Sequence, residues 1–132
     1  VDTRRARAMY EALNKAMDAG HVASCHDASD GGLGAALAET AFAGGHGVEA
    51  DLRELKVEDP VVLLFSESQS RFVVTVDAGN AEAFETAMNG HPCFRVGHVT
   101  EAETLALTLP ADSACNAPLA ELKEAWQAPL RW

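Results

Sequence analysis

Apolar and polar positions along this chain follow two periods, and each period predicts one type of element. From Ala6 to Met17 the apolar side chains recur at helical spacing, which is typical of a helix with one buried face. We therefore expect a helix over about residues 3–19, ended by Gly20. A second helix is expected to stop at Gly44.

Shorter runs predict the remaining elements. Asp59 followed by Pro60 suits the start of a single helical turn over residues 61–65. Asn80 can cap another helix, and an apolar stripe predicts a last helix over residues 119–127. The expected strands are residues 21–25, 48–52, 71–76, 94–99 and 104–109. Strands thus interleave with helices, without an internal repeat or a linker.

Length limits the domain count. A chain of 132 residues is the size of one domain with one core, so we expect a single domain over residues 1–132. The chain begins at Val1, without an initiator Met or a signal segment. We therefore expect a piece of a longer polypeptide, with part of its apolar surface facing other domains.

Charge and cysteine content argue against several function classes. The chain has 20 acidic and 10 basic residues, and its formal net charge of −10 repels nucleic acid and anionic membrane surfaces. No apolar run approaches the roughly 20 residues of a membrane span. Three scattered cysteines suggest reduced thiols rather than a disulfide framework. We expect a cytoplasmic protein with no nucleic-acid or membrane partner.

The turn from Asp27 to Gly32 joins a predicted strand to the second predicted helix and carries two acids and two glycines. Backbone N–H groups at such a helix start can face a phosphate, and a carboxylate can hold the accompanying Mg²⁺. The glycines equally suit a plain tight connection, and Asp27 and Asp30 could be helix caps. For His26, a hydrogen-bonded structural role is favoured over a general base.

A second polar cluster runs from Phe65 to Arg71, between two apolar runs. Its hydroxyls, amide and guanidinium suit recognition of anions and sugar hydroxyls. The alternative is a polar turn before a strand, with Arg71 paired to a nearby acid.

Three segments of the chain resemble a known family. They are the run His26-Asp27-Ala28-Ser29-Asp30-Gly31-Gly32-Leu33 with the later Ala38-Glu39, the run Leu-Phe-Ser-Glu-Ser-Gln-Ser-Arg-Phe-Val-Val from Leu64 to Val74, and the terminal Glu121-Leu122-Lys123-Glu124-Ala125-Trp126. They are similar to the C-terminal domain of phosphoribosylformylglycinamidine synthase, in its small bacterial-type synthetase subunit. This resemblance implies an α+β fold, an α/β sandwich with a mixed sheet, partly ferredoxin-like, as in AIR synthase-related C-terminal domains.

The resemblance also implies an activity. The family's ligase uses ATP and Mg²⁺ to convert formylglycinamide ribonucleotide and glutamine-derived ammonia to formylglycinamidine ribonucleotide in purine biosynthesis. Its implied partners are the remaining domains of the synthetase, a glutaminase subunit and a small accessory subunit. An isolated C-terminal domain is expected to be inactive.

Site residues follow from the same resemblance. Asp27 is expected to bind the metal, and Glu67, Ser68 and Gln69 to contact the substrate. The residues expected to bind the nucleotide are Asp30, Gly31, Gly32, Ser68, Gln69 and Arg71. Because the family has two pseudo-symmetric halves, these residues are expected to serve the auxiliary nucleotide site, and we assign no catalytic residue.

Two alternatives remain open at this point. One is a domain of a related small-molecule kinase of the thiamine-monophosphate kinase type, which would need no ammonia. The other is a noncatalytic module whose nucleotide fixes domain packing and subunit assembly.

Overall fold

The computed structural model describes residues 2–131, which form five α-helices, six strands and three short 3₁₀ turns. The helices are α1 (Thr3–Asp18), α2 (Gly32–Gly44), α3 (Pro60–Phe65), α4 (Ala81–Ala87) and α5 (Leu119–Gln127). The strands are β1 (Ser24–Asp27), β2 (Gly47–Asp51), β3 (Phe72–Thr75), β4 (Gly97–Thr100), β5 (Thr104–Thr108) and β6 (Ala114–Pro118). The 3₁₀ turns are η1 (Leu52–Leu55), η2 (Ala78–Asn80) and η3 (Ala128–Leu130).

The strands form two separate sheets. β1 and β3 pair antiparallel as a two-stranded ladder, with Asp27 opposite Phe72. The other four strands form a sheet in the order β4-β2-β5-β6, in which β2 and β5 are parallel and the two outer pairs are antiparallel. The four-stranded sheet is therefore mixed, which confirms the predicted α+β class.

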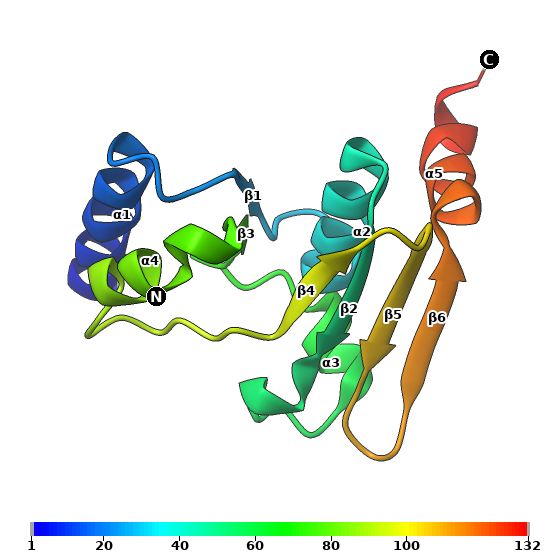
Figure 1. The fold of residues 1–132 in the computed structure, drawn as a ribbon. Helices are drawn as coiled ribbons and strands as arrows, with labels where there is room; N and C mark the ends of the chain where they lie inside the picture. Colours follow the sequence, from blue (N-terminus) through cyan, green and yellow to red (C-terminus); the bar gives the residue numbers. More distant parts are fainter. Residues whose placement is uncertain (1, 132) are drawn as a thin grey trace.

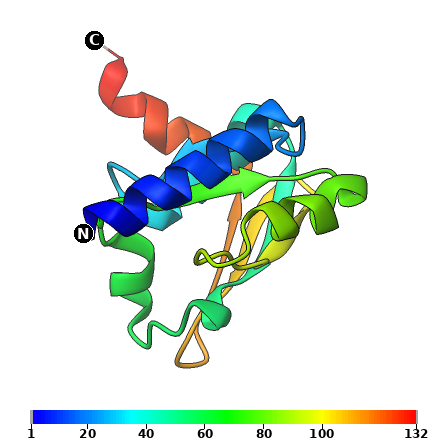
Figure 2. The ribbon, with the colours of Figure 1, turned by 90° about the vertical axis from the view of Figure 1, so that its left-hand side faces the viewer.

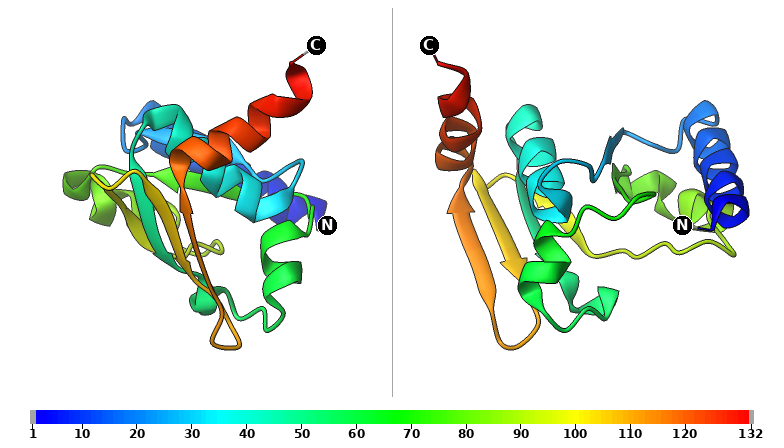
Figure 3. Two further views of the ribbon diagram at one scale, coloured as in Figure 1. Left: turned by 90° about the vertical axis from the view of Figure 1, so that its right-hand side faces the viewer. Right: turned by 180° about the vertical axis from the view of Figure 1, so that it is seen from behind.

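Helix α2 lies between the ladder and the four-stranded sheet, with α1 and α4 at the far side of the ladder (Figures 1 and 3). Figure 2 shows α1 lying across that far side. Because α2 contacts strands of both sheets, it buries residues on several faces, including Ala36, Leu37 and Ala41. A helix that is apolar on all sides is typical of such a central position.

Two apolar clusters meet at the ladder. One joins α2 to the four-stranded sheet and includes Leu52, the most buried large side chain of the described residues. The other joins α1 to α4 through Leu13 and Phe84. Alternate residues of β3 serve both clusters, since Phe72 packs against the second and Val73 against the first. The ladder thus connects the two halves of the molecule.

Several element boundaries differ from the predictions. β1 runs from Ser24 to Asp27 instead of over residues 21–25, because these are the residues that pair with Phe72–Thr75 of β3. β4 begins at Gly97, where its pairing with β2 starts, instead of at residue 94. β6 was not predicted, because its sequence Ala-Cys-Asn-Ala-Pro has low strand propensity and forms a strand only by pairing with β5. The single turn at residues 61–65 is confirmed as α3, with Asp59 as its N-cap.

Within residues 2–131, no helix is long and apolar enough to cross a membrane.

Candidate functional site

The turn between β1 and α2 is held by two consecutive glycines in the left-handed region. Gly31 has φ 76° and Gly32 has φ 67°, conformations that side-chain-bearing residues rarely adopt. Gly32 also lies against the end of α3, where an added Cβ would come within 2.6 Å of the Ser66 carbonyl oxygen. These glycines therefore let α2 begin directly against the loop that follows α3.

That loop, residues 66–71, meets the turn through two hydrogen bonds. The Gly31 backbone N–H donates to Glu67 Oε1 at 3.0 Å, and the Ala28 N–H donates to the Arg71 carbonyl oxygen at 2.9 Å. Two segments separated by about 40 residues in sequence are thereby placed side by side. Together they form the edge of the candidate site.

Glu67 and Arg71 both act within this junction. The Glu67 carboxylate lies at the N-terminus of α2, where an acidic group is stabilising and where the sequence predicts a phosphate. The Arg71 guanidinium donates to the carbonyl oxygens of Ser66 and Ser68, the latter at 3.1 Å from Nε. Arg71 therefore organises its own loop, and it forms no ion pair with an acid among the described residues.

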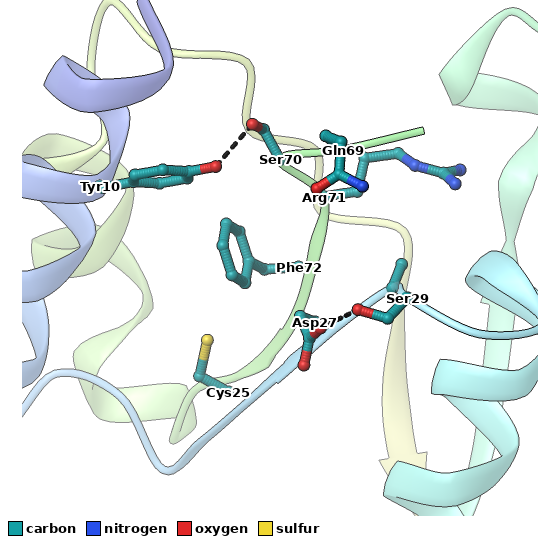
Figure 4. Close-up of a pocket in the computed structure, with 9 residues that line it drawn as sticks. Tyr10, Cys25, Asp27, Ser29, Gln69, Ser70, Arg71 and Phe72 are labelled. Carbon is teal, nitrogen blue, oxygen red and sulfur yellow. Dashed lines mark hydrogen bonds between the residues drawn. The ribbon is translucent and has the colours of Figure 1, made fainter. Parts of the chain in front are cut away.

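A hollow of about 380 Å³ opens between α1, the ladder and this loop (Figure 4). Its lining residues are Tyr10, Cys25, Asp27, Ala28, Ser29, Gln69, Ser70, Arg71 and Phe72. A second hollow of about 320 Å³ adjoins it along α1 and shares Tyr10, Gln69 and Ser70 with it. Tyr10, Gln69 and Ser70 thus lie between the two hollows.

Tyr10 and Ser70 connect α1 to the loop across this hollow. The Tyr10 hydroxyl and Ser70 Oγ are 2.6 Å apart, and the Tyr10 ring meets Phe72 edge to face with centroids 5.7 Å apart. Ser70 has φ 68°, a left-handed conformation that is uncommon for a residue with a side chain. Such local strain is typical of ligand-binding loops.

Asp27 carries the negative charge that faces the first hollow. Its side chain is 58% exposed, and its pKa is lowered chiefly by a hydrogen bond from the Ser29 hydroxyl, with a smaller contribution from His26. The carboxylate is therefore ionised at neutral pH and can bind a cation. No group of three or more His, Cys, Asp or Glu side chains within residues 2–131 could hold a metal ion.

The structure tests the alternative roles of the two aspartates and of His26 in the turn. The N-cap of α2 is Gly31, without a side-chain cap, so neither Asp27 nor Asp30 caps this helix. His26 Nε2 lies 2.6 Å from Glu39 Oε2, which confirms the predicted hydrogen-bonded histidine.

The structure brings most of the predicted site residues together, but in two groups. Asp27, Gln69 and Arg71 line the first hollow, whereas Gly31 and Glu67 form the junction beside it. Asp30 and Ser68 are exposed and lie outside the lining, and Gly32 is buried against α3.

Sequence reasoning missed the contributions of Tyr10, Cys25 and Phe72 to the lining. Tyr10 offered a signal, because it places a hydroxyl next to the apolar stripe of the first helix and is the single tyrosine of the chain. Cys25 and Phe72 read as ordinary strand residues.

Comparisons with known proteins agree with this structure. A family model described as "AIR synthase related protein, C-terminal domain" matches residues 1–110. The phosphoribosylformylglycinamidine synthase subunit PurL of Limosilactobacillus fermentum is 41% identical over 127 residues, which cover 96% of this chain and 16% of that protein. The chain thus spans about a sixth of the length of such curated relatives.

Solved structures of PurL from T. maritima have the same fold. The complex with FGAR is 25% identical, with a TM-score of 0.75 over 89% of this chain and 20% of the other. The complex with AMPPCP is 26% identical, with a TM-score of 0.73 over 86% of this chain and 21% of the other. PurLQS from Thermotoga maritima gives 25% identity and a TM-score of 0.74 over 89% and 21%. With a family model that matches most of its length and with this shared fold, the chain belongs to the family of AIR synthase related proteins, C-terminal domain.

Proposed function

We propose that this chain is one domain of a phosphoribosylformylglycinamidine synthase, the ATP-dependent ligase that converts formylglycinamide ribonucleotide and ammonia to formylglycinamidine ribonucleotide. The observation that carries the proposal is the 41% identity to a PurL subunit over 96% of the chain, together with the shared fold. Domain boundaries at residues 1–132 and a cytoplasmic location belong to the same proposal.

The nucleotide and metal would bind at the first hollow and the junction beside it. PurL structures complexed with AMPPCP and with ADP support a nucleotide site in this family. Asp27 would hold Mg²⁺, since its exposed carboxylate is ionised at neutral pH. Mg²⁺ and ATP would supply charge neutralisation and the phosphoryl group. Gln69, together with Ser68 beside the hollow, would contact the nucleotide.

The junction requires one rearrangement for phosphate binding. The Gly31 N–H donates to Glu67, so a phosphate at the α2 N-terminus would have to replace that carboxylate. In this proposal Glu67 then becomes available to the substrate. Asp30, Gly31 and Gly32 would surround the phosphate, while Arg71 would act by holding the loop.

Glu67→Gln tests this rearrangement. Removing the charge weakens a competitor for the Gly31 N–H, so AMPPCP should bind more tightly, whereas formylglycinamide ribonucleotide should bind more weakly. Calorimetric titration of the full-length protein measures both affinities. Glu58→Gln, at an exposed position before α3, serves as the matched control. Unchanged affinity for both ligands in Glu67→Gln would refute this role of Glu67.

Partners follow from the same assignment. The structure of PurLQS shows that PurL occurs in an assembly with further subunits. This chain would therefore contact the remaining synthetase domains. The complete enzyme would bind a glutaminase subunit and a small accessory subunit.

Ammonium-dependent ADP release tests the activity. The full-length protein is given Mg²⁺·ATP and formylglycinamide ribonucleotide, with and without an ammonium salt. We expect ADP release that requires both the ribonucleotide and ammonium. ADP release that needs an acceptor but not ammonium would favour the kinase of the same superfamily.

The second candidate role for this half of the enzyme is to hold a nucleotide without taking part in catalysis. The hydrogen bonds of Glu67 to Gly31 and of Arg71 to loop carbonyls are compatible with either role. Asp27→Ala distinguishes the roles. Lower thermal stability with turnover retained by the folded enzyme indicates a holding role, whereas lost turnover at unchanged stability indicates a catalytic one.

A further inference from the structure

Three side chains from three elements meet beside the Asp27 end of β1. His26 of β1 and Trp126 of α5 approach the same carboxylate, that of Glu39 in α2. His26 Nε2 lies 2.6 Å from Glu39 Oε2, and Trp126 Nε1 donates to Glu39 Oε1 at 2.8 Å. The proposed function uses none of these contacts.

The two bonds fix the direction of both ring N–H groups. An indole N–H only donates and an ionised carboxylate only accepts, so each Glu39 oxygen accepts one bond. His26 consequently donates from Nε2, and its Nδ1 points away from Glu39. Hydrogen bonds to a carboxylate are stronger than those between neutral groups, and the Glu39 side chain is only 29% exposed.

Trp126 brings α5 into this arrangement. Its ring packs on Phe42 with centroids 5.8 Å apart, yet the residue remains 50% exposed. Apolar contact on one face leaves the ring free to slide, whereas the bond to Glu39 selects one orientation. Glu39 and Phe42 are three residues apart in α2 and so present a polar and an apolar contact to the same indole.

His26 passes this constraint to the candidate metal site. Its Nδ1 lies 3.7 Å from Asp27 Oδ1, which is too long for a hydrogen bond but brings the two side chains into contact. His26 and Asp27 are successive residues at the end of β1, with His26 bonded to Glu39 of α2 and Asp27 lining the hollow beside α1. Holding His26 on the α2 face therefore restricts how Asp27 is presented on the α1 face.

We propose that Glu39 is a positioning residue that couples the docking of α5, through Trp126, to the orientation of His26 and hence of Asp27. The inference rests on the proposed Mg²⁺–nucleotide site at Asp27. Binding of the metal–nucleotide complex and docking of α5 then favour each other, because coupling between two sites is reciprocal.

The experiment uses the full-length protein and Mg²⁺·AMPPCP as the probe. Glu39→Gln removes the charge and keeps the size of the side chain, and Trp126→Phe removes the indole N–H and keeps an aromatic ring. Glu124→Gln is the control on the same helix, since Glu124 forms an exposed ion pair with Arg131. Asp27→Asn identifies by calorimetry which binding site belongs to this domain. Thermal unfolding of each variant sets the temperature at which all are folded.

We expect Glu39→Gln and Trp126→Phe each to weaken binding at the Asp27-dependent site by roughly threefold to tenfold, and Glu124→Gln to leave it unchanged. Because Trp126 acts through Glu39, the double variant should bind no more weakly than Glu39→Gln alone. In protein labelled with 5-fluorotryptophan, the ¹⁹F signal that Trp126→Phe removes should shift when Mg²⁺·AMPPCP is added. A purely structural role of Glu39 would not produce that shift.

Two results would overturn the inference, and they differ. Weakened binding in Asp27→Asn, with Glu39→Gln and Trp126→Phe equal to the control, would leave the proposed site standing and refute the coupling. Binding by Asp27→Asn that equals the unsubstituted protein would refute the site itself, and the coupling with it. If Glu39→Gln folds poorly, the binding measured for Trp126→Phe is sufficient to test the coupling.

Discussion

Replacement of Gly32 by alanine tests the close approach on which the candidate site depends. Gly32 has φ 67°, and a Cβ there would lie 2.6 Å from the Ser66 carbonyl oxygen and 2.7 Å from that of Leu64. Both contacts are with backbone atoms, which cannot rotate away as a side chain can. Gly32→Ala should therefore both strain the turn and push α2 away from the end of α3.

The expected loss of stability has two contributions. A left-handed conformation costs a residue with a side chain about 1–2 kcal/mol. Overpacking by a methyl group in a close-packed site costs about 1–3 kcal/mol more. A loss of about 2–5 kcal/mol is a large fraction of the roughly 5–15 kcal/mol that stabilises a typical domain.

Urea denaturation of the 132-residue chain, followed by circular dichroism, measures this loss. Gly34→Ala is the matched control, because a Cβ at Gly34 meets its nearest neighbour, Leu64, only at 3.4 Å and an alanine there favours the helix. We expect Gly34→Ala to unfold at the same or a higher urea concentration. A loss below about 1 kcal/mol in Gly32→Ala would refute the reasoning, since the left-handed conformation alone should cost that much.

Three further predictions concern single contacts. Arg53 lowers the pKa of Asp51 to about 2 by hydrogen bonding, so the stability that Asp51 contributes is complete above about pH 4 and is lost as the pH falls toward 2. The free energy of unfolding should therefore fall less steeply with decreasing pH in Asp51→Asn than in the unsubstituted chain. Asp59 accepts from two backbone N–H groups as the N-cap of α3, so Asp59→Ala should lower the free energy of unfolding by about 1 kcal/mol in urea, and an unchanged value would contradict the cap. Partial burial raises the pKa of the Cys25 thiol and the charge of Asp27 raises it further, so its reaction with a disulfide reagent at pH 8 should accelerate in Asp27→Asn, and an equal rate would contradict that influence.

The fold was predictable where local pattern and tertiary packing agree. The stripe from Ala6 to Met17 predicted α1, and Asp59 before Pro60 predicted the short α3 despite its strand-like composition. Pairing across the sheets was not predictable, because a strand such as β6 owes its conformation to β5 and not to its own residues. The division into two apolar clusters follows from β3, whose alternate residues face opposite sides, and no local pattern indicates that.

The candidate site was predictable in its loops but not in their contacts. The acids and glycines of the turn and the polar run at residues 66–71 were both identified, and the structure places them side by side. The bond between Gly31 and Glu67 and the commitment of Arg71 to its own loop depend on how α2 meets α3. Tyr10 joins the hollow from 60 residues away, a proximity that only the folded chain creates.

Transfer of nitrogen from ammonium to the ribonucleotide is the most direct test of the proposed ligase. The full-length protein is supplied with Mg²⁺·ATP, formylglycinamide ribonucleotide and ¹⁵N-ammonium, and the masses of the products are measured by mass spectrometry. The account predicts ¹⁵N-labelled formylglycinamidine ribonucleotide, formed together with equal amounts of ADP and phosphate. Consumption of ATP without labelled product, or transfer of its phosphoryl group to a stable acceptor, would contradict it.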